Sequence, residues 1–174
     1  MKTKLIVTLL LLASPILIST SIAYAALDLK SFTPLNKPTD VVWTGDGLVA
    51  SREGETSLVM ISADGKALKP FASSFTATGE VHLAVSHGKA GFPSGYMYAV
   101  SGKTVYQIDS SGGEVKKFST PSDKADISFL TFDNVGRWGY LLYAVSSDGL
   151  VWSINSDGKP NLVVSIGEGL PRGI

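Results

Sequence analysis

Three carboxylates recur at one position of the sequence pattern, each immediately before a run of apolar, β-forming residues. They are Asp40, Glu80 and Asp126. If these runs are the first strands of repeated units, the three acids converge at one end of the fold. Carboxylate oxygens are the ligands that Ca²⁺ and Mg²⁺ prefer. The pattern therefore predicts a divalent-cation site, and the alternative interpretation is that each acid only keeps a strand start solvated.

A histidine follows the second of these acids. His82 lies in the run that begins at Val81, and an imidazole titrates near neutral pH, where it can serve as a general base. A single histidine without a partner is more often a hydrogen-bonded structural residue. The sequence contains no Gly-x-Ser-x-Gly, His-Glu-x-x-His, P-loop or Gly-x-Gly-x-x-Gly motif. We therefore assign no catalytic residue, and no cofactor is identified apart from Ca²⁺ or Mg²⁺.

Two longer connections carry the residue types that anchor interfaces. Residues 87–95 and 133–139 occupy the same slot of the repeat, where the first unit has only residues 44–47. They contain Phe92, Arg137 and Trp138. Because aromatic and arginine side chains dominate binding energy at interfaces, these three residues predict a surface for a protein or a glycan. The alternative is that Trp138 packs beneath its own unit.

The elements that position these residues form a repeat. Residues 57–65, 104–112 and 150–158 read alike, and Ile61, Ile108 and Ile154 are 47 and 46 positions apart. The glycines at 65, 112 and 158 keep the same spacing. Upstream, residues 98–101 recur at 143–146, and residues 48–51 stand in the equivalent place. Several features in fixed order at one period indicate repeated structural units.

Each unit contains four short β-type runs separated by Gly, Asp, Asn and Ser. In the first unit the runs are 41–43, 48–50, 58–61 and 68–71, and in the third they are 127–132, 140–145, 151–154 and 162–166. Asp-Gly or Gly-Gly pairs between the third and fourth runs favour tight hairpins. No stretch after the expected signal peptide shows sustained helical periodicity. A twelve-stranded sandwich or barrel is the alternative, but it does not require equal intervals.

The expected fold class is all-β: a β-propeller with three four-stranded antiparallel blades and the start of a fourth. The expected boundaries are 1–25 for a signal peptide, 26–37 for a lead-in, 38–78, 79–125 and 126–168 for the blades, and 169–174 for the start of the fourth. Propellers close with about 4–8 blades. We therefore expect either a fragment of a longer propeller or two copies that complete a ring as a homodimer.

These repeats resemble the secreted, mostly six-bladed propellers of the NHL-repeat, YVTN-type, gluconolactonase-like and strictosidine-synthase-like group. The likeness rests on residues 98–101, 104–109, 149–154 and 157–158, and on the terminal residues 170–174. It implies a propeller fold in a group that includes lyases, lactonases, dehydrogenases and binding scaffolds. The Glu-Gly-Pro that opens the metal site of the gluconolactonase-like proteins is absent from this sequence, as is any Trp-Asp dipeptide.

The N-terminus has the pattern of a secretory signal. Lys2 and Lys4 precede an uncharged run from Leu5 to Ala26, and Ala23 and Ala25 fit the signal-peptidase pattern, so cleavage is expected after Ala25. A retained membrane anchor is the alternative. After cleavage, the protein is expected to be periplasmic or extracellular and free of the membrane. The sequence contains no cysteine, so no disulfide can form. Cleavage leaves 13 basic against 15 acidic residues, which predicts no nucleic-acid binding.

The composition and motifs favour an exported β-propeller that serves as a binding scaffold. The alternative is a fragment of a propeller enzyme of the lactonase, lyase or sugar-dehydrogenase type, with its site in the central channel. A third interpretation is a truncated product without activity of its own. Fold-level likeness does not choose among these, because a function depends on its site.

Overall fold

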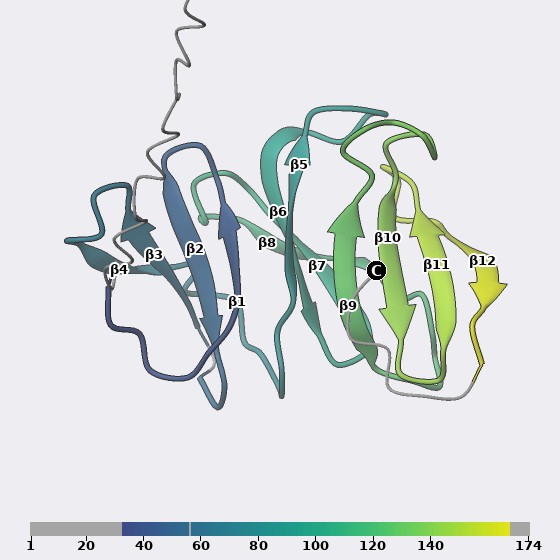
Figure 1. Ribbon diagram of the computed structural model, residues 1–174, viewed down its shortest axis with the longest axis horizontal. Coiled ribbons are helices and arrows are strands. Elements are labelled where there is room, and N and C mark those ends of the chain that lie inside the picture. The colour runs from purple at the N-terminus through teal and green to yellow at the C-terminus, as the bar shows by residue number, and fades with distance from the viewer. Residues whose placement is uncertain (1–32, 56, 168–174) are drawn as a thin grey trace, which may run out of the picture. The chain divides into compact units, whose positions relative to one another are not determined.

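The computed structural model describes residues 33–55 and 57–167. Within them it contains twelve strands and no helix (Figure 1). The strands are β1 Pro38–Trp43, β2 Gly47–Arg52, β3 Leu58–Ser62, β4 Leu68–Phe71, β5 Leu83–His87, β6 Ser94–Ser101, β7 Thr104–Ile108, β8 Val115–Ser119, β9 Ile127–Phe132, β10 Leu142–Ser146, β11 Leu150–Ile154 and β12 Pro160–Ser165. No helix in this part of the chain is long and apolar enough to cross a membrane. The expected signal peptide and the start of a fourth blade lie outside the described residues.

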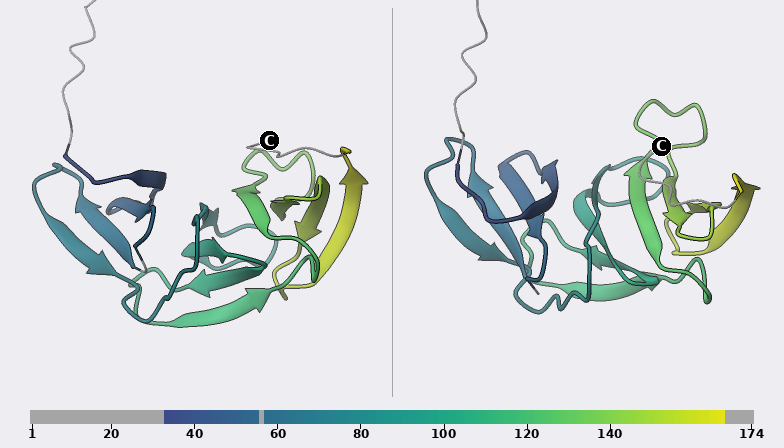
Figure 2. Two further views of the ribbon diagram at one scale, coloured as in Figure 1. Left: turned by 90° about the horizontal axis from the view of Figure 1, so that it is seen from below. Right: turned by 60° about the horizontal axis from the view of Figure 1, so that its bottom comes forward.

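The strands form three four-stranded antiparallel sheets, each made of four consecutive strands in chain order. Figure 2 shows these sheets following one another from two further directions. The first strands of neighbouring sheets are in contact, β1 with β5 and β5 with β9. Each sheet matches one predicted repeat unit. The predicted fold class is confirmed, and we refer to the sheets as blades 1, 2 and 3.

The turn between third and fourth strands is the same in all three blades. The N–H groups of Gly65, Gly112 and Gly158 donate to the carbonyl oxygens of Ser62, Asp109 and Asn155, at 2.8, 3.0 and 2.9 Å. The φ angles of the glycines are +73°, +76° and +78°, in the left-handed region that side chains with a Cβ rarely adopt. The repeated glycine is therefore a requirement of the backbone.

The pairing of strands corrects the alignment of the repeat in blade 1. Ala50, Ala99 and Ala144 each pair with the residue two positions before the repeated isoleucine of the third strand. Ala50 is thus the equivalent of Ala99, and the sequence-based match of residues 48–51 with 98–101 is wrong by one residue. Side chains alternate across a strand, so this shift decides which of them face the next blade.

The core lies between the blades. One cluster joins blade 1 to blade 2 and includes Val49, Leu58, Phe71, Leu83, Met97 and Ile108, and a second joins blade 2 to blade 3 and includes Phe92, Tyr98, Val105, Phe132, Leu142 and Ile154. In the second cluster, Gln107 Nε2 donates to the hydroxyl oxygen of Tyr98 at 2.6 Å. Burial raises the pKa of Tyr98 to about 12 even though this hydrogen bond opposes the shift.

Candidate functional site

The first strands of all three blades line one hollow of about 290 Å³. Its walls are Val42 and Trp43 of β1, Leu83, Ala84, Val85 and His87 at β5, and Thr131, Phe132 and Asn134 at β9. Antiparallel pairing places the connections between first and second strands at one end of each blade, together with the turns between third and fourth strands. We call this end of the blades the loop end. The residues from β1, β5 and β9 converge beside it.

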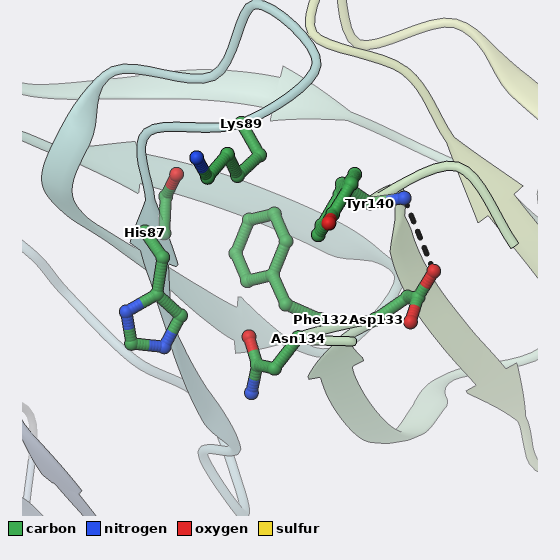
Figure 3. A pocket seen from close by; sticks show the side chains of 7 residues that line it. His87, Lys89, Phe132, Asp133, Asn134 and Tyr140 are labelled. Atoms are coloured by element: carbon green, nitrogen blue, oxygen red, sulfur yellow. Dashed lines mark hydrogen bonds between the residues drawn. The ribbon is translucent and has the colours of Figure 1, made fainter. Parts of the chain in front are cut away.

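Polar side chains surround an aromatic ring at the loop end. A second hollow, of about 50 Å³, is lined by Ser86, His87, Lys89, Phe132, Asp133, Asn134 and Tyr140. In Figure 3 the side chains of His87, Lys89, Asn134 and Tyr140 lie around the ring of Phe132. The side chains of His87, Lys89 and Asn134 are exposed and form no hydrogen bond or ion pair with another described residue. They are therefore available to a bound molecule.

Asp133 shapes the loop that joins β9 to β10. Its carboxylate accepts hydrogen bonds from the N–H groups of Val135, Gly136, Trp138 and Tyr140, at 3.3, 2.9, 2.7 and 3.1 Å. Desolvation acts to raise the pKa of Asp133, but these four N–H donors outweigh it, so the pKa lies below its ordinary value. One side chain thus holds the loop in the conformation that presents Asn134 and Tyr140.

The loop residues predicted from the sequence differ in their placement. Phe92 does not lie on the loop surface where the sequence analysis placed it, because its side chain is buried in the core between blades 2 and 3. Trp138 and Arg137 are exposed at the loop end. Trp138 lines a third hollow, of about 280 Å³, with Val135 and Tyr143. The structure therefore keeps Trp138 and Arg137 on one loop and separates Phe92 from them.

The three predicted cation ligands are not gathered into one group. Asp40 lies inside β1, where its Oδ2 accepts from the N–H of Leu83 at 2.8 Å, so it links blade 1 to blade 2. Glu80 and Asp126 are exposed before β5 and β9. Within residues 33–55 and 57–167, no three His, Asp or Glu side chains are placed to hold a metal ion. The cation site stays a prediction, and this geometry gives it no support.

His82 lies directly before β5, not inside a strand as the sequence suggested. Its Nδ1 is 4.0 Å from Oδ2 of Asp40, and its ring is partly buried. The ring of Phe129 lies 6.2 Å away, centroid to centroid. The pair of His82 and Asp40 is the one arrangement among the predicted site residues that resembles a general base with an orienting carboxylate.

Sequence reasoning missed most residues around the first and second hollows. It identified the connections that contain His87, Lys89 and Asn134, but not which of their side chains face a common space. The Asp-Asn-x-Gly pattern at residues 133–136 is a signal for the Asp133 turn, because Asp side chains bond the backbone just after themselves. The contribution of Phe132 depends on packing between blades, which no local pattern specifies.

No family model and no curated protein matches this sequence. Solved structures do match its fold. Hydrazine synthase from Kuenenia stuttgartiensis has a TM-score of 0.60 at 15% identity, over 86% of this chain and 41% of that one. The WD40 repeats of RRP9 have a TM-score of 0.54 at 18% identity, over 78% and 40%.

A protein of unknown function from Bacteroides thetaiotaomicron VPI-5482 has a TM-score of 0.57 at 16% identity, over 77% and 33%. The likeness to the WD40 repeats of RRP9, together with the four-stranded sheets of this chain, identifies the fold. The fold is a β-propeller. This chain spans less than half the length of each of these structures. At such identities the likeness concerns the propeller architecture alone.

Proposed function

We propose that this propeller is an exported binding scaffold and that its partner protein contacts the loop end of blades 2 and 3. The observation that carries the proposal is the set of exposed, unengaged side chains of His87, Lys89 and Asn134 around the ring of Phe132. Hydrogen-bonding groups around an apolar floor are the usual composition of a binding site. No catalytic group is required for this role.

The charge at this site favours a protein that presents carboxylate or carbonyl oxygens. Lys89 contributes an ammonium group, Asn134 an amide, and Arg137 a guanidinium on the neighbouring loop. The carboxylate of Asp133 is occupied by four backbone N–H groups and is therefore a poor acceptor for sugar hydroxyls. A glycan partner is the alternative. A second copy of the chain is a further partner.

Site-specific photo-cross-linking in the producing cell tests the loop end. A photoreactive residue at position 89 is expected to give one discrete adduct with another protein. Lys124 is the matched control, because it is exposed on the connection between β8 and β9, at the opposite end of the blades. Adducts of equal yield from both positions would contradict the proposal. Glycan binding that is lost in Lys89→Ala would make the partner a glycan instead.

Export has its own test. The run from Leu5 to Ala26 and the small residues Ala23 and Ala25 support a cleaved signal peptide and a periplasmic or extracellular protein. N-terminal sequencing of the protein from cell fractions is expected to begin at Ala26. A chain that retains Met1 and stays with the membranes would show that the segment is an anchor.

An enzyme remains the second candidate because of His82 and Asp40. With Nδ1 and Oδ2 4.0 Å apart, a small movement gives a hydrogen bond, and the imidazole can then act as a general base. Turnover of lactones by the wild-type chain that falls at least about 100-fold in His82→Gln would establish this role, since general-base catalysis contributes on the order of 10²–10⁴. Turnover that is unchanged in this variant would assign the activity elsewhere.

A further inference from the structure

The contact between blades 2 and 3 contains a cluster of four aromatic rings. Phe92 and Tyr98 are 5.7 Å apart, centroid to centroid, in an edge-to-face arrangement, and Tyr98 lies 4.9 Å from Phe118 of β8. The fourth ring is Phe132 of blade 3, at 5.0 Å from Phe92 and 5.3 Å from Tyr98. Two rings of blade 2 thus contact the ring of Phe132, and Phe118 packs behind them against Tyr98 and Phe92.

Blade 3 presents the same three positions again. Trp138 occupies the loop slot of Phe92, and its ring lies 5.8 Å from Tyr143, also edge to face. Tyr143 has the register of Tyr98. Each tyrosine directly precedes an alanine, and that alanine pairs with the residue two positions before the repeated isoleucine of the third strand. Val163 holds the place of Phe118, because each is the unpaired residue at the register shift between the third and fourth strands of its blade. Blade 3 therefore carries the equivalents of the residues that blade 2 contributes to its contact with blade 3.

Blade 1 presents the missing fourth position. Trp43 pairs with Leu48 in β1 and β2, as Phe132 pairs with Leu142 in β9 and β10. Trp43 thus holds in blade 1 the place that Phe132 holds in blade 3. Val41 likewise holds the place of Leu130, since both pair with the repeated alanine. Blade 1 carries the face that a preceding blade covers.

Exposure separates the completed contact from the open positions. Phe92 and Phe132 are 3% and 8% exposed, whereas Trp138 and Trp43 are 69% and 52% exposed. Val163 is 51% exposed. Leu35 of the lead-in lines a hollow on blade 1 together with Val59 and Leu68. Trp43 does not line that hollow. Two large indoles with blade-contact registers are thus left without a described neighbouring blade.

We propose that a second copy of this chain supplies the missing contact, with Trp43 of each copy packed against Trp138 and Tyr143 of the other, and with Val163 of that other copy behind them. The two faces have opposite polarity, so blade 3 of one copy meets blade 1 of the other, and the same junction forms twice about a two-fold axis. Three and three blades make a ring of six, within the range in which propellers close. The contact is a continuation of one that the chain already contains.

The glycine of the shared turn predicts a second contact at this junction. A Cβ on Gly112 would lie 2.8 Å from a ring carbon of Phe71, and a Cβ on Gly158 would lie 2.2 Å from the carbonyl oxygen of Phe118. The turns of blades 2 and 3 therefore lie directly on the fourth strand of the preceding blade. At the proposed junction, Gly65 of one copy lies in the same way on Val163 of the other.

Cross-linking between two single-cysteine variants tests the polarity of the junction, since the natural chain contains no cysteine. Full-length Trp43→Cys and Trp138→Cys proteins are each treated with a short bismaleimide, alone and after mixing with exchange of subunits. The proposal predicts a cross-linked dimer only in the mixture. A dimer from either variant alone would show that like faces meet, and no cross-link in the mixture would remove the contact; both outcomes overturn the proposal.

The mass of the wild-type protein in solution, measured by light scattering after size exclusion, is expected to be that of two chains. Trp138→Ser is expected to raise the dimer dissociation constant roughly 30-fold or more, the effect of losing one buried interface aromatic, with the strand signal in circular dichroism retained. Arg137→Ser is the matched control on the same loop and is expected to leave the dimer intact. A monomer, or an open-ended polymer, would overturn the ring. None of these readouts involves Lys89, so a negative result here leaves the partner-binding proposal untouched.

Discussion

Blade 2 and blade 3 use the same aromatic positions with opposite consequences. In blade 2, Phe92 leaves its loop and enters the core beside Tyr98, where a ring of the next blade completes the packing. In blade 3, Trp138 lies against Tyr143 in the same way, but no described blade follows, and the indole faces outward. The side chain on the loop thus takes its role from the neighbouring blade more than from its own.

The largest effect on stability is expected when the loop aromatics of blades 2 and 3 are removed in turn. Phe92→Ala is expected to lower the free energy of unfolding by about 3–5 kcal/mol, because it empties a filled core position. Trp138→Ala is expected to cost the isolated chain less than about 1 kcal/mol, as for an exposed residue. Urea unfolding at protein concentrations below the dimer dissociation constant measures both. Equal losses would mean that the two positions are packed alike.

The close approach of the blades gives the next largest effect. Gly158→Ala is expected to lower the free energy of unfolding by about 3 kcal/mol, since it combines a positive φ with a clash against the carbonyl oxygen of Phe118. Gly139→Ala is the matched control: its φ is +85°, but the added methyl group would only touch Leu141 at 3.8 Å. We expect a cost of about 1–2 kcal/mol there. A difference of zero would contradict the contact.

Alkaline pH examines the buried hydroxyl between the two blades. The pKa of Tyr98 is about 12 in the folded chain and near 10 when unfolded, so the unfolded state loses its proton first and stability falls as pH rises above about 10. Between pH 10 and 11 this effect amounts to about 1 kcal/mol. In Tyr98→Phe the same pH interval should show a smaller slope in chemical unfolding. An unchanged slope would assign the titration to other groups.

The smallest expected effect concerns the exposed loop of blade 3. The lowered pKa of Asp133 means that its contribution is present above the ordinary aspartate pKa and is lost as pH falls through the folded value. The amide resonances of Trp138 and Tyr140 should therefore titrate together below the usual aspartate range in NMR spectra. Asp133→Asn should abolish this titration and leave the thermal midpoint within a few degrees. Titration at the ordinary value would show that the four hydrogen bonds are weak.

Much of the architecture was readable from the sequence because it depends on local pattern. The spacing of Ile61, Ile108 and Ile154 predicted three units, and the glycines after them predicted the hairpins that the structure contains. The run 127–132 coincides with β9. Tyr140, in contrast, was expected in a strand and lies in the loop with a φ of +57°, because Asp133 holds its N–H. A side-chain contact seven residues away overrode the β-propensity of tyrosine.

The candidate site was only partly predictable. The two long connections were recognised, and Arg137 and Trp138 are exposed there, but Phe92 is a core residue, and His87, Lys89 and Asn134 were not singled out. The alignment of blade 1 was also misjudged by one residue, which exchanged the two faces of β2. Periodic sequence determines which residues recur, whereas strand pairing determines which face each recurrence occupies.

By itself, the sequence determined the three blades that the structure describes, most of their strands and the glycine turns, since β-propensity and positive φ act within a few residues. The tertiary structure alone decided which equivalent side chains are buried. Asp40 became an acceptor for the backbone of the next blade instead of one of three gathered carboxylates, and Phe92 and Trp138 received opposite environments. Burial and interblade contact arise between chain segments some 45 residues apart, and no local pattern encodes the presence of a neighbouring blade.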